Sequence, residues 1–125
     1  MGNESPRSVS PRSYQKLDVW RDGVALVRDV YALTQSWPGE GRFGPTSQIR
    51  RAAVSVPSNI AEGWGRHKKG GFDQFLRYAR GSLFEVDTQL VLSVEVGIAT
   101  EAQVEPLRQR LDVLSRRTLA LRRSL

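Results

Sequence analysis

The sequence contains no cysteine, and its only histidine is His67. Without cysteine the chain forms no disulfide bond and has no thiolate nucleophile, which fits a reducing cytoplasm. With one histidine we expect neither a histidine-rich metal cluster nor a Ser-His-Asp triad. Walker loops and dinucleotide glycine fingerprints are also missing, and Glu62, Glu85 and Asp87 do not recur as in a carboxylate metal site. We therefore expect no metal, no cofactor and no enzymatic activity.

Long apolar runs are missing as well, since every run is only a few residues long. A helix that crosses a membrane needs about 20 apolar residues, so no membrane partner is expected. Residues 1–13 are rich in serine, proline and charge, and they lack the apolar stretch of a signal peptide. We interpret them as a disordered tail and expect one cytoplasmic domain over residues 14–125.

Basic residues outnumber acidic ones, with 19 Lys and Arg against 13 Asp and Glu and a net charge of +6. Such a surplus favours an anionic partner, RNA or DNA bound without sequence specificity before an anionic membrane. The alternative is a domain that happens to be basic, and composition leaves both open.

Apolar residues recur every three to four positions in four segments, which is the spacing of amphipathic helices. The predicted helices span residues 17–37, 45–64, 71–96 and 101–123. Pro45 suits a first helical position, Gly97 suits a helix end, and Thr100 with Gln103 forms a capping-box pattern. Short loops and the lack of any strand pattern predict an all-α, antiparallel up-down-up-down four-helix bundle.

The first predicted helix is apolar over roughly 200° of its circumference. This arc is wider than one bundle usually needs, which favours a homo-oligomer in which a neighbouring chain buries the outer row. The alternative is that two helices of the same chain cover the whole arc. The residues assigned to an oligomer interface are Val19, Leu26, Val30, Leu33 and Trp37.

Gly81 lies inside the third predicted helix, where glycine costs about 1 kcal/mol relative to alanine. Because a glycine removes side-chain bulk, Gly81 and the neighbouring Ser82 predict a close approach between two helices.

Charge is unevenly distributed along the chain. Arginine and lysine concentrate in residues 66–80 and 106–125, whereas residues 81–105 contain neither. In an up-down bundle the two basic segments meet at one end, which predicts a phosphate-binding pole. Some of these arginines also complement the dipole of the last helix, which requires no function. The candidate nucleic-acid contacts are Arg50, Arg51, Arg66, Lys68, Lys69, Arg77, Arg80, Arg116, Arg117 and Arg123.

The segment 48–66, QIRRAAVSVPSNIAEGWGR, resembles the four-helix-bundle family of bacterial 23S rRNA-intervening-sequence proteins. Residues 17–20, 30–34 and 75–85 carry the resemblance further. It implies an antiparallel four-helix bundle, commonly a homopentamer, in a family whose members mostly have no assigned activity. One branch is similar to accessory variability proteins of diversity-generating retroelements, which are basic pentamers that bind nucleic acid and a reverse transcriptase.

Carried onto this chain, the family motif includes Arg50, Arg51, Arg66 and Arg77. The sequence departs from the family pattern at Pro45, where leucine is usual, and at residues 70–71, where two glycines replace a polar helix start. These departures concern the local helix starts rather than the fold.

Three functions remain for comparison. The first is a non-enzymatic accessory protein that binds nucleic acid, with a reverse transcriptase or ribosomal RNA as a further partner. The second is a structural or protein-interaction homo-oligomer that does not bind nucleic acid. The third is a bundle for a small molecule, which would need an unfilled core pocket and which the bulky aliphatic seams oppose.

Overall fold

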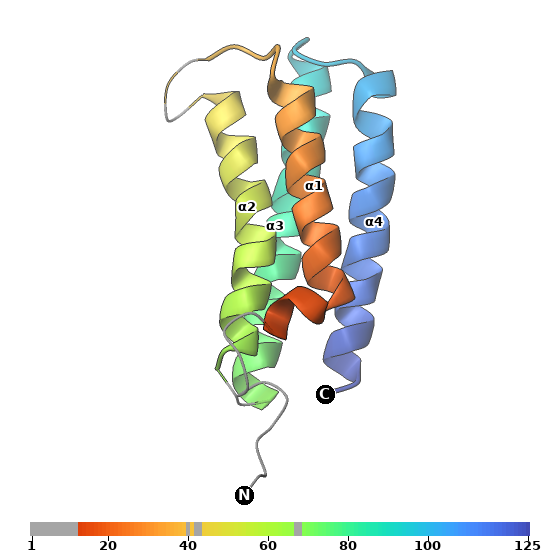
Figure 1. Cartoon of the computed structure of the whole chain (residues 1–125). Coiled ribbons are helices and arrows are strands. Elements are labelled where there is room, and N and C mark those ends of the chain that lie inside the picture. The colour runs from red at the N-terminus through yellow and green to blue at the C-terminus, as the bar shows by residue number, and fades with distance from the viewer. Residues whose placement is uncertain (1–12, 40, 42–43, 67–68) are drawn as a thin grey trace, which may run out of the picture.

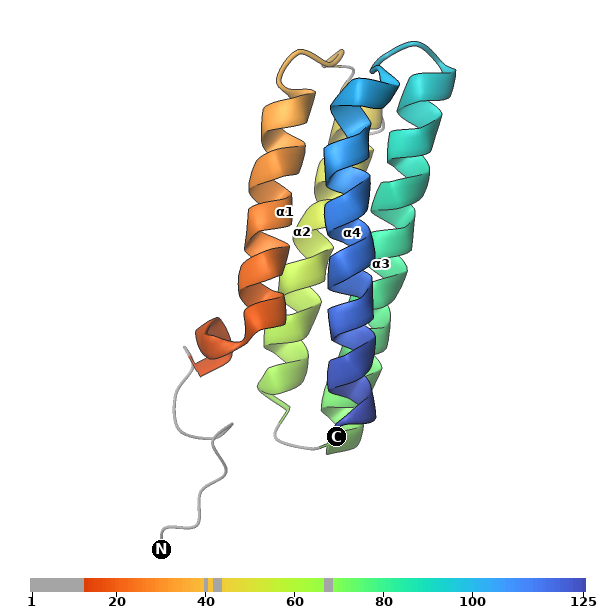
Figure 2. The same cartoon turned by 90° about the vertical axis from the view of Figure 1, so that its right-hand side faces the viewer.

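The computed structural model describes residues 13–39, 41, 44–66 and 69–125. A 3-10 turn, η2 (Ser13–Lys16), precedes four helices: α1 (Asp18–Thr34), α2 (Pro45–Trp64), α3 (Lys69–Glu95) and α4 (Glu101–Arg123). The helices lie lengthwise beside one another, and successive helices connect at alternate ends of the molecule (Figures 1 and 2). Strands are absent from the described residues, which confirms the all-α class.

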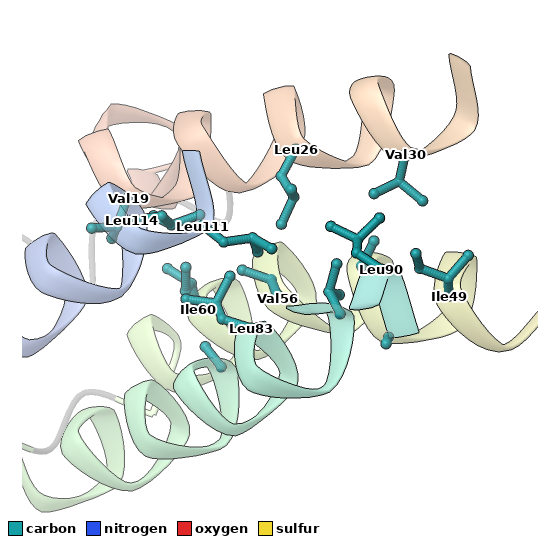
Figure 3. Close-up of a cluster of buried hydrophobic side chains, with 14 of the residues drawn as sticks. Val19, Leu26, Val30, Ile49, Val56, Ile60, Leu83, Leu90, Leu111 and Leu114 are labelled. Atoms are coloured by element: carbon teal, nitrogen blue, oxygen red, sulfur yellow. The ribbon is translucent and has the colours of Figure 1, made fainter. Parts of the chain in front are cut away.

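The core lies along the axis of the bundle, where apolar side chains from all four helices converge (Figure 3). Each helix contributes residues spaced by three or four, because only that spacing keeps them on one face. The labelled members are Val19, Leu26, Val30, Ile49, Val56, Ile60, Leu83, Leu90, Leu111 and Leu114, all nearly or fully buried. Burial of this apolar surface is the main force that holds the helices together.

The predicted oligomer interface on the first helix is corrected by this packing. Val19, Leu26 and Val30 are buried in the core of the single chain, and so is Trp37. Leu33 is half-buried and packs against the same core. Since α1 contacts both α2 and α4, two helices of the same chain cover these five residues, while Tyr31 on the same helix stays exposed. No outer apolar row is left on these residues for a neighbouring chain.

The end of α1 also differs from the prediction, because the helix stops at Thr34 rather than at Trp37. The backbone N–H of Trp37 donates to the carbonyl of Thr34 at 3.0 Å, which closes a turn. Pro38 follows and cannot continue a helix. The turn lets the indole of Trp37 fold back onto the core.

Gly63, and not Gly81, is the glycine that sets how closely two helices approach. A Cβ on Gly63 would lie 2.5 Å from the Cβ of Phe75, so α2 and α3 can touch here only with glycine. A Cβ on Gly23 would meet Pro57 at 3.4 Å, which is ordinary contact. Around Gly81 nothing described lies within 4 Å, so the predicted helix contact there is wrong. Its neighbour Ser82 does reach α2, where its hydroxyl accepts from Ser55 at 2.5 Å.

The connection between α3 and α4 forms as its residues predict. Gly97 has a φ of +80°, a conformation that glycine adopts without strain. Thr100 then caps α4: its hydroxyl accepts from the Gln103 N–H at 3.2 Å, and the Gln103 amide oxygen accepts from the Thr100 N–H at 2.9 Å. This reciprocal pair confirms the capping box.

Candidate nucleic-acid interface

One end of the bundle brings together η2, the last turns of α2, the first turns of α3 and the last turns of α4 (Figures 1 and 2). We call it the basic end. Several of the predicted contacts lie on these helix ends and on the α3–α4 side of the bundle. They are Arg66, Arg77, Arg80, Arg116 and Arg123. The fold thus gathers cations from three helices that are far apart in the sequence.

Three of these arginines form ion pairs with a carboxylate four residues earlier in the chain. Arg66 pairs with Glu62 at 2.8 Å, and Arg116 pairs with Asp112 at 2.7 Å. Arg77 lies 3.8 Å from Asp73. All three guanidinium groups are exposed, and exposed pairs of this kind contribute only about 0–1 kcal/mol. A phosphate can therefore replace the carboxylate at little cost.

Arg80 and Arg123 have no carboxylate partner within the part of the chain that the structure describes. Arg123 is exposed on the last turn of α4. The Nη2 of Arg80 donates to the Ser115 hydroxyl at 3.3 Å, while its buried Nε finds no hydrogen-bond partner among the described residues. Because that Nε is buried, an anion would reach Arg80 through its terminal guanidinium nitrogens, whereas all of the Arg123 guanidinium can be approached from solvent.

Two predicted contacts lie away from the basic end, and a third, Arg117, lies beside Arg116 but is paired with another helix. Arg50 and Arg51 are near the start of α2, at the opposite end of the bundle. The guanidinium of Arg50 lies 4.3 Å from the centre of the Tyr31 ring, and its Nε donates to Thr34 at 2.9 Å. Arg50 thereby joins α2 to α1. Arg117 joins α4 to α1 through Asp22, at 2.6 Å.

The two lysines of the loop cannot be placed with the arginines. Lys68 lies outside the described residues, and Lys69 begins α3 but its side chain is not described. The contribution of these two lysines to the predicted phosphate-binding pole therefore stays a prediction.

The model of the 23S rRNA-intervening sequence protein family matches residues 15–120, which include α1, α2, α3 and nearly all of α4. The chain belongs to the 23S rRNA-intervening sequence protein family. This match confirms the resemblance seen in the sequence. No curated protein gives a significant match.

In this family member, Arg122 is a charged residue that sequence reasoning left out of the site. Its Nε lies 2.9 Å from Asp73, and its side chain is only 18% exposed. Asp73 thus faces both Arg122 of α4 and Arg77 of its own helix. Nothing in a single helix pattern shows this pair, because it spans two helices that meet only in the folded chain.

Two exposed aromatic residues were also left out of the predicted site. Tyr78 is 49% exposed and Phe84 is 58% exposed on the outer face of α3. The signal was present in the sequence, since both residues fall outside the apolar seam of the third helix. Arg80 reaches toward one of them, with its guanidinium 5.6 Å from the centre of the Phe84 ring.

A groove between α3 and α4 limits the basic surface on the side away from the basic end. It has a volume of about 330 Å³ and is lined by three carboxylates, those of Asp87, Glu105 and Asp112. The one guanidinium in it, Arg108, is 2.7 Å from Asp87. The hydrogen bond and charge of Asp87 raise the pKa of Arg108 above its ordinary value. A groove with this charge disfavours a phosphate.

The described residues contain no group of three or more His, Asp or Glu side chains arranged to hold a metal ion. None of the described helices is long and apolar enough to span a membrane.

Proposed function

We propose that this protein is a non-enzymatic accessory protein that binds nucleic acid through phosphate contacts at its basic end. The family description names an intervening sequence of 23S rRNA, which supports RNA as the ligand. The resemblance to retroelement accessory proteins supports a reverse transcriptase as a protein partner. In this proposal the chain is an antiparallel bundle that acts in the cytoplasm as a homopentamer.

The observation that carries the proposal is the cluster of arginines at the basic end, of which Arg66, Arg77, Arg116 and Arg123 are exposed and Arg80 is half-buried. Arg80 and Arg123 face no carboxylate in the described chain, and the pairs of Arg66 and Arg116 are exposed. A polyanion can engage all of them at once and release the counterions condensed on it, which gives affinity without base recognition. Binding of this kind weakens steeply as the salt concentration rises.

Charge reversal on α4 tests the proposal. The double variant Arg116→Glu/Arg123→Glu changes two exposed residues at the basic end. Titration of a labelled RNA by fluorescence anisotropy, at several salt concentrations, should show weaker binding. The slope of log K against log salt should fall by about 2, since each lost phosphate contact removes about one released counterion.

The matched control is Arg28→Glu/Arg51→Glu, which makes the same change of charge at exposed positions away from the basic end. Its affinity should fall much less, and its salt slope should stay that of the native protein. If both double variants weaken binding equally, only the total charge matters and the basic end is not the site. If neither variant changes binding, the proposed function is wrong.

Self-assembly is a second candidate function, and a specific surface favours it. The last turns of α3 expose Val91, Leu92 and Val96. Leu92 and Val96 border an apolar pocket of about 270 Å³ that also includes Trp37 and Pro45. Exposed apolar residues beside a pocket are typical of a protein contact. This surface lies at the end of the bundle opposite the basic end, so the two functions are compatible.

Sedimentation velocity of the native protein and of Leu92→Asp/Val96→Asp tests this second function. The native protein should sediment as an oligomer and the variant as a smaller species, because a buried unpaired carboxylate is costly. A native monomer at micromolar concentration would contradict self-assembly through this surface.

A further inference from the structure

The outer face of α3 carries aromatic rings that the bundle does not use. Tyr78 is held in place by Gln74, whose Nε2 donates to the phenol oxygen at 2.7 Å. It also packs edge-to-face against Phe75, with 5.3 Å between the two ring centroids. Phe84 projects further, and more than half of its surface meets solvent. Exposed rings of this size contribute nothing to the core of one chain. Each ring is a flat surface on which another planar group can stack.

Gly81 separates the two rings along the helix. Tyr78 and Phe84 are six residues apart, which is about 9 Å along the helix axis and about 120° around it, with Gly81 midway between them. A side chain at Gly81 would contact nothing within 4 Å, so the surface between the rings is bare backbone. Glycine inside a helix costs stability, and no packing within the described chain explains it here. The gap gives a ligand direct access to the helix surface between the rings.

Cations surround the rings on the same surface. Helical spacing aligns Arg77 with Gly81 and Phe84. Arg80 lies on the side of Phe84 that faces α4, where it contacts Ser115. On the side that faces α2, the guanidinium of Arg66 lies 4.7 Å from the centre of the Phe75 ring. Rings alternate with guanidinium groups across this surface, which we call the aromatic–arginine strip.

We propose that the aromatic–arginine strip binds single-stranded nucleic acid, with bases stacked on Tyr78 and Phe84 and phosphates bound by Arg77 and Arg80. The inference rests on the proposed function and adds the class of ligand. Single strands expose the faces of their bases, and sequence-tolerant binding combines such stacking with a cationic path for the backbone. A duplex keeps its base faces covered and can use only the arginines.

Charge decides between nucleic acid and a protein as the occupant of this strip. Its arginines complement a phosphate backbone, whereas Glu85 and the acidic groove, which Phe84 itself borders, mark where the favourable path ends. Further along α3, Val91 and Leu92 are exposed with no arginine on the same helix beside them. That part of α3 suits an apolar protein surface, whereas the strip suits a polyanion with stackable bases.

The test replaces both rings without removing their apolar bulk. Tyr78→Leu/Phe84→Leu should weaken binding of an unstructured, labelled RNA strand at least about tenfold, because leucine cannot stack on a base. Binding of a duplex of the same sequence should stay within about twofold, since its contacts are to phosphates. The same titrations with a DNA strand establish whether the strip distinguishes the two sugars.

Two further variants make the result specific. Val54→Ala/Val113→Ala removes exposed apolar surface from α2 and α4, outside both proposed surfaces, and should leave single-strand affinity unchanged. Phe84→Trp keeps a flat ring and should retain native affinity. Thermal unfolding of each variant confirms that the bundle still forms, which is expected because Tyr78 and Phe84 lie outside the core.

Several outcomes would overturn this inference. One is an unchanged single-strand affinity in the leucine variant, and another is an equal loss for strand and duplex. A third is a smaller oligomer with unchanged RNA affinity, which would assign the rings to a protein contact. The proposed function fails by a different result, namely insensitivity of all binding to Arg116→Glu/Arg123→Glu. The two ideas can therefore be rejected separately.

Discussion

α1 and α3 both carry more apolar residues than one inward row requires, yet the bundle treats the surplus differently. On α1 the surplus is mostly covered, because α2 and α4 pack against the helix from two sides, and Tyr31 is its one large apolar residue that stays exposed among the described residues. On α3 it stays exposed at Tyr78, Phe84 and Leu92, because these residues point away from both neighbouring helices. The width of an apolar arc therefore does not show whether the same chain covers it. What decides this is the direction in which the arc faces relative to the neighbouring helices.

Truncating one leucine on α1 and one on α3 should give the largest difference in the free energy of unfolding. Leu26→Ala removes a fully buried side chain and should lower the free energy of unfolding by about 2–5 kcal/mol. Leu92→Ala, at a residue that is 52% exposed, should change it by less than about 0.5 kcal/mol. Urea denaturation followed by circular dichroism measures both. Equal losses would mean that α3's outer face is covered in solution, which would break the comparison.

Adding one methyl group at Gly63, which faces α3, and at Gly81, which faces solvent, tests the same contrast between covered and uncovered helix surface. Gly63→Ala should destabilise the fold by about 1–3 kcal/mol, because the new Cβ collides with the Phe75 Cβ at a distance of 2.5 Å. Gly81→Ala should stabilise it by about 0.5–1 kcal/mol, because alanine favours a helix and meets no neighbour. Melting temperatures in one buffer provide the comparison. A destabilised Gly81→Ala would indicate that a partner touches the helix there in the assembled protein.

Removing one arginine from an ion pair should give the smallest difference in the free energy of unfolding. Arg122→Ala breaks the pair with Asp73 between α3 and α4 and should cost about 1 kcal/mol, since this guanidinium is mostly buried. Arg116→Ala, whose side chain is 71% exposed, should cost less than about 0.5 kcal/mol. Urea denaturation at low and at high salt measures both, and only the small effect of Arg116 should vanish with salt. The reverse order would contradict the assignment of Arg122 to the fold.

Sequence periodicity predicted the four helices and the capping box at Thr100, because both depend on residues close together in the chain. It failed at Gly81. The helix destabilisation caused by this glycine was explained by a close helix contact, but no described atom lies within 4 Å of the position. It also failed at Val19, Leu26 and Val30, since one helix does not reveal how many neighbours it has. The candidate site was predicted in part. Arg66, Arg77 and Arg80 were chosen from a charge pattern, whereas Tyr78 and Phe84 were overlooked.

The amino-acid sequence by itself determined that this chain is helical, basic and without cysteine, because propensity, charge and apolar spacing act over a few residues. Only the tertiary structure decided which arginines stand together and which serve the fold. Arg50 and Arg117 join α1 to its neighbours, while Arg80 and Arg123 keep unused donors at one end. The physical reason is that the partner of a side chain depends on the rotation of each helix about its axis. That rotation is set by the packing of all four helices together.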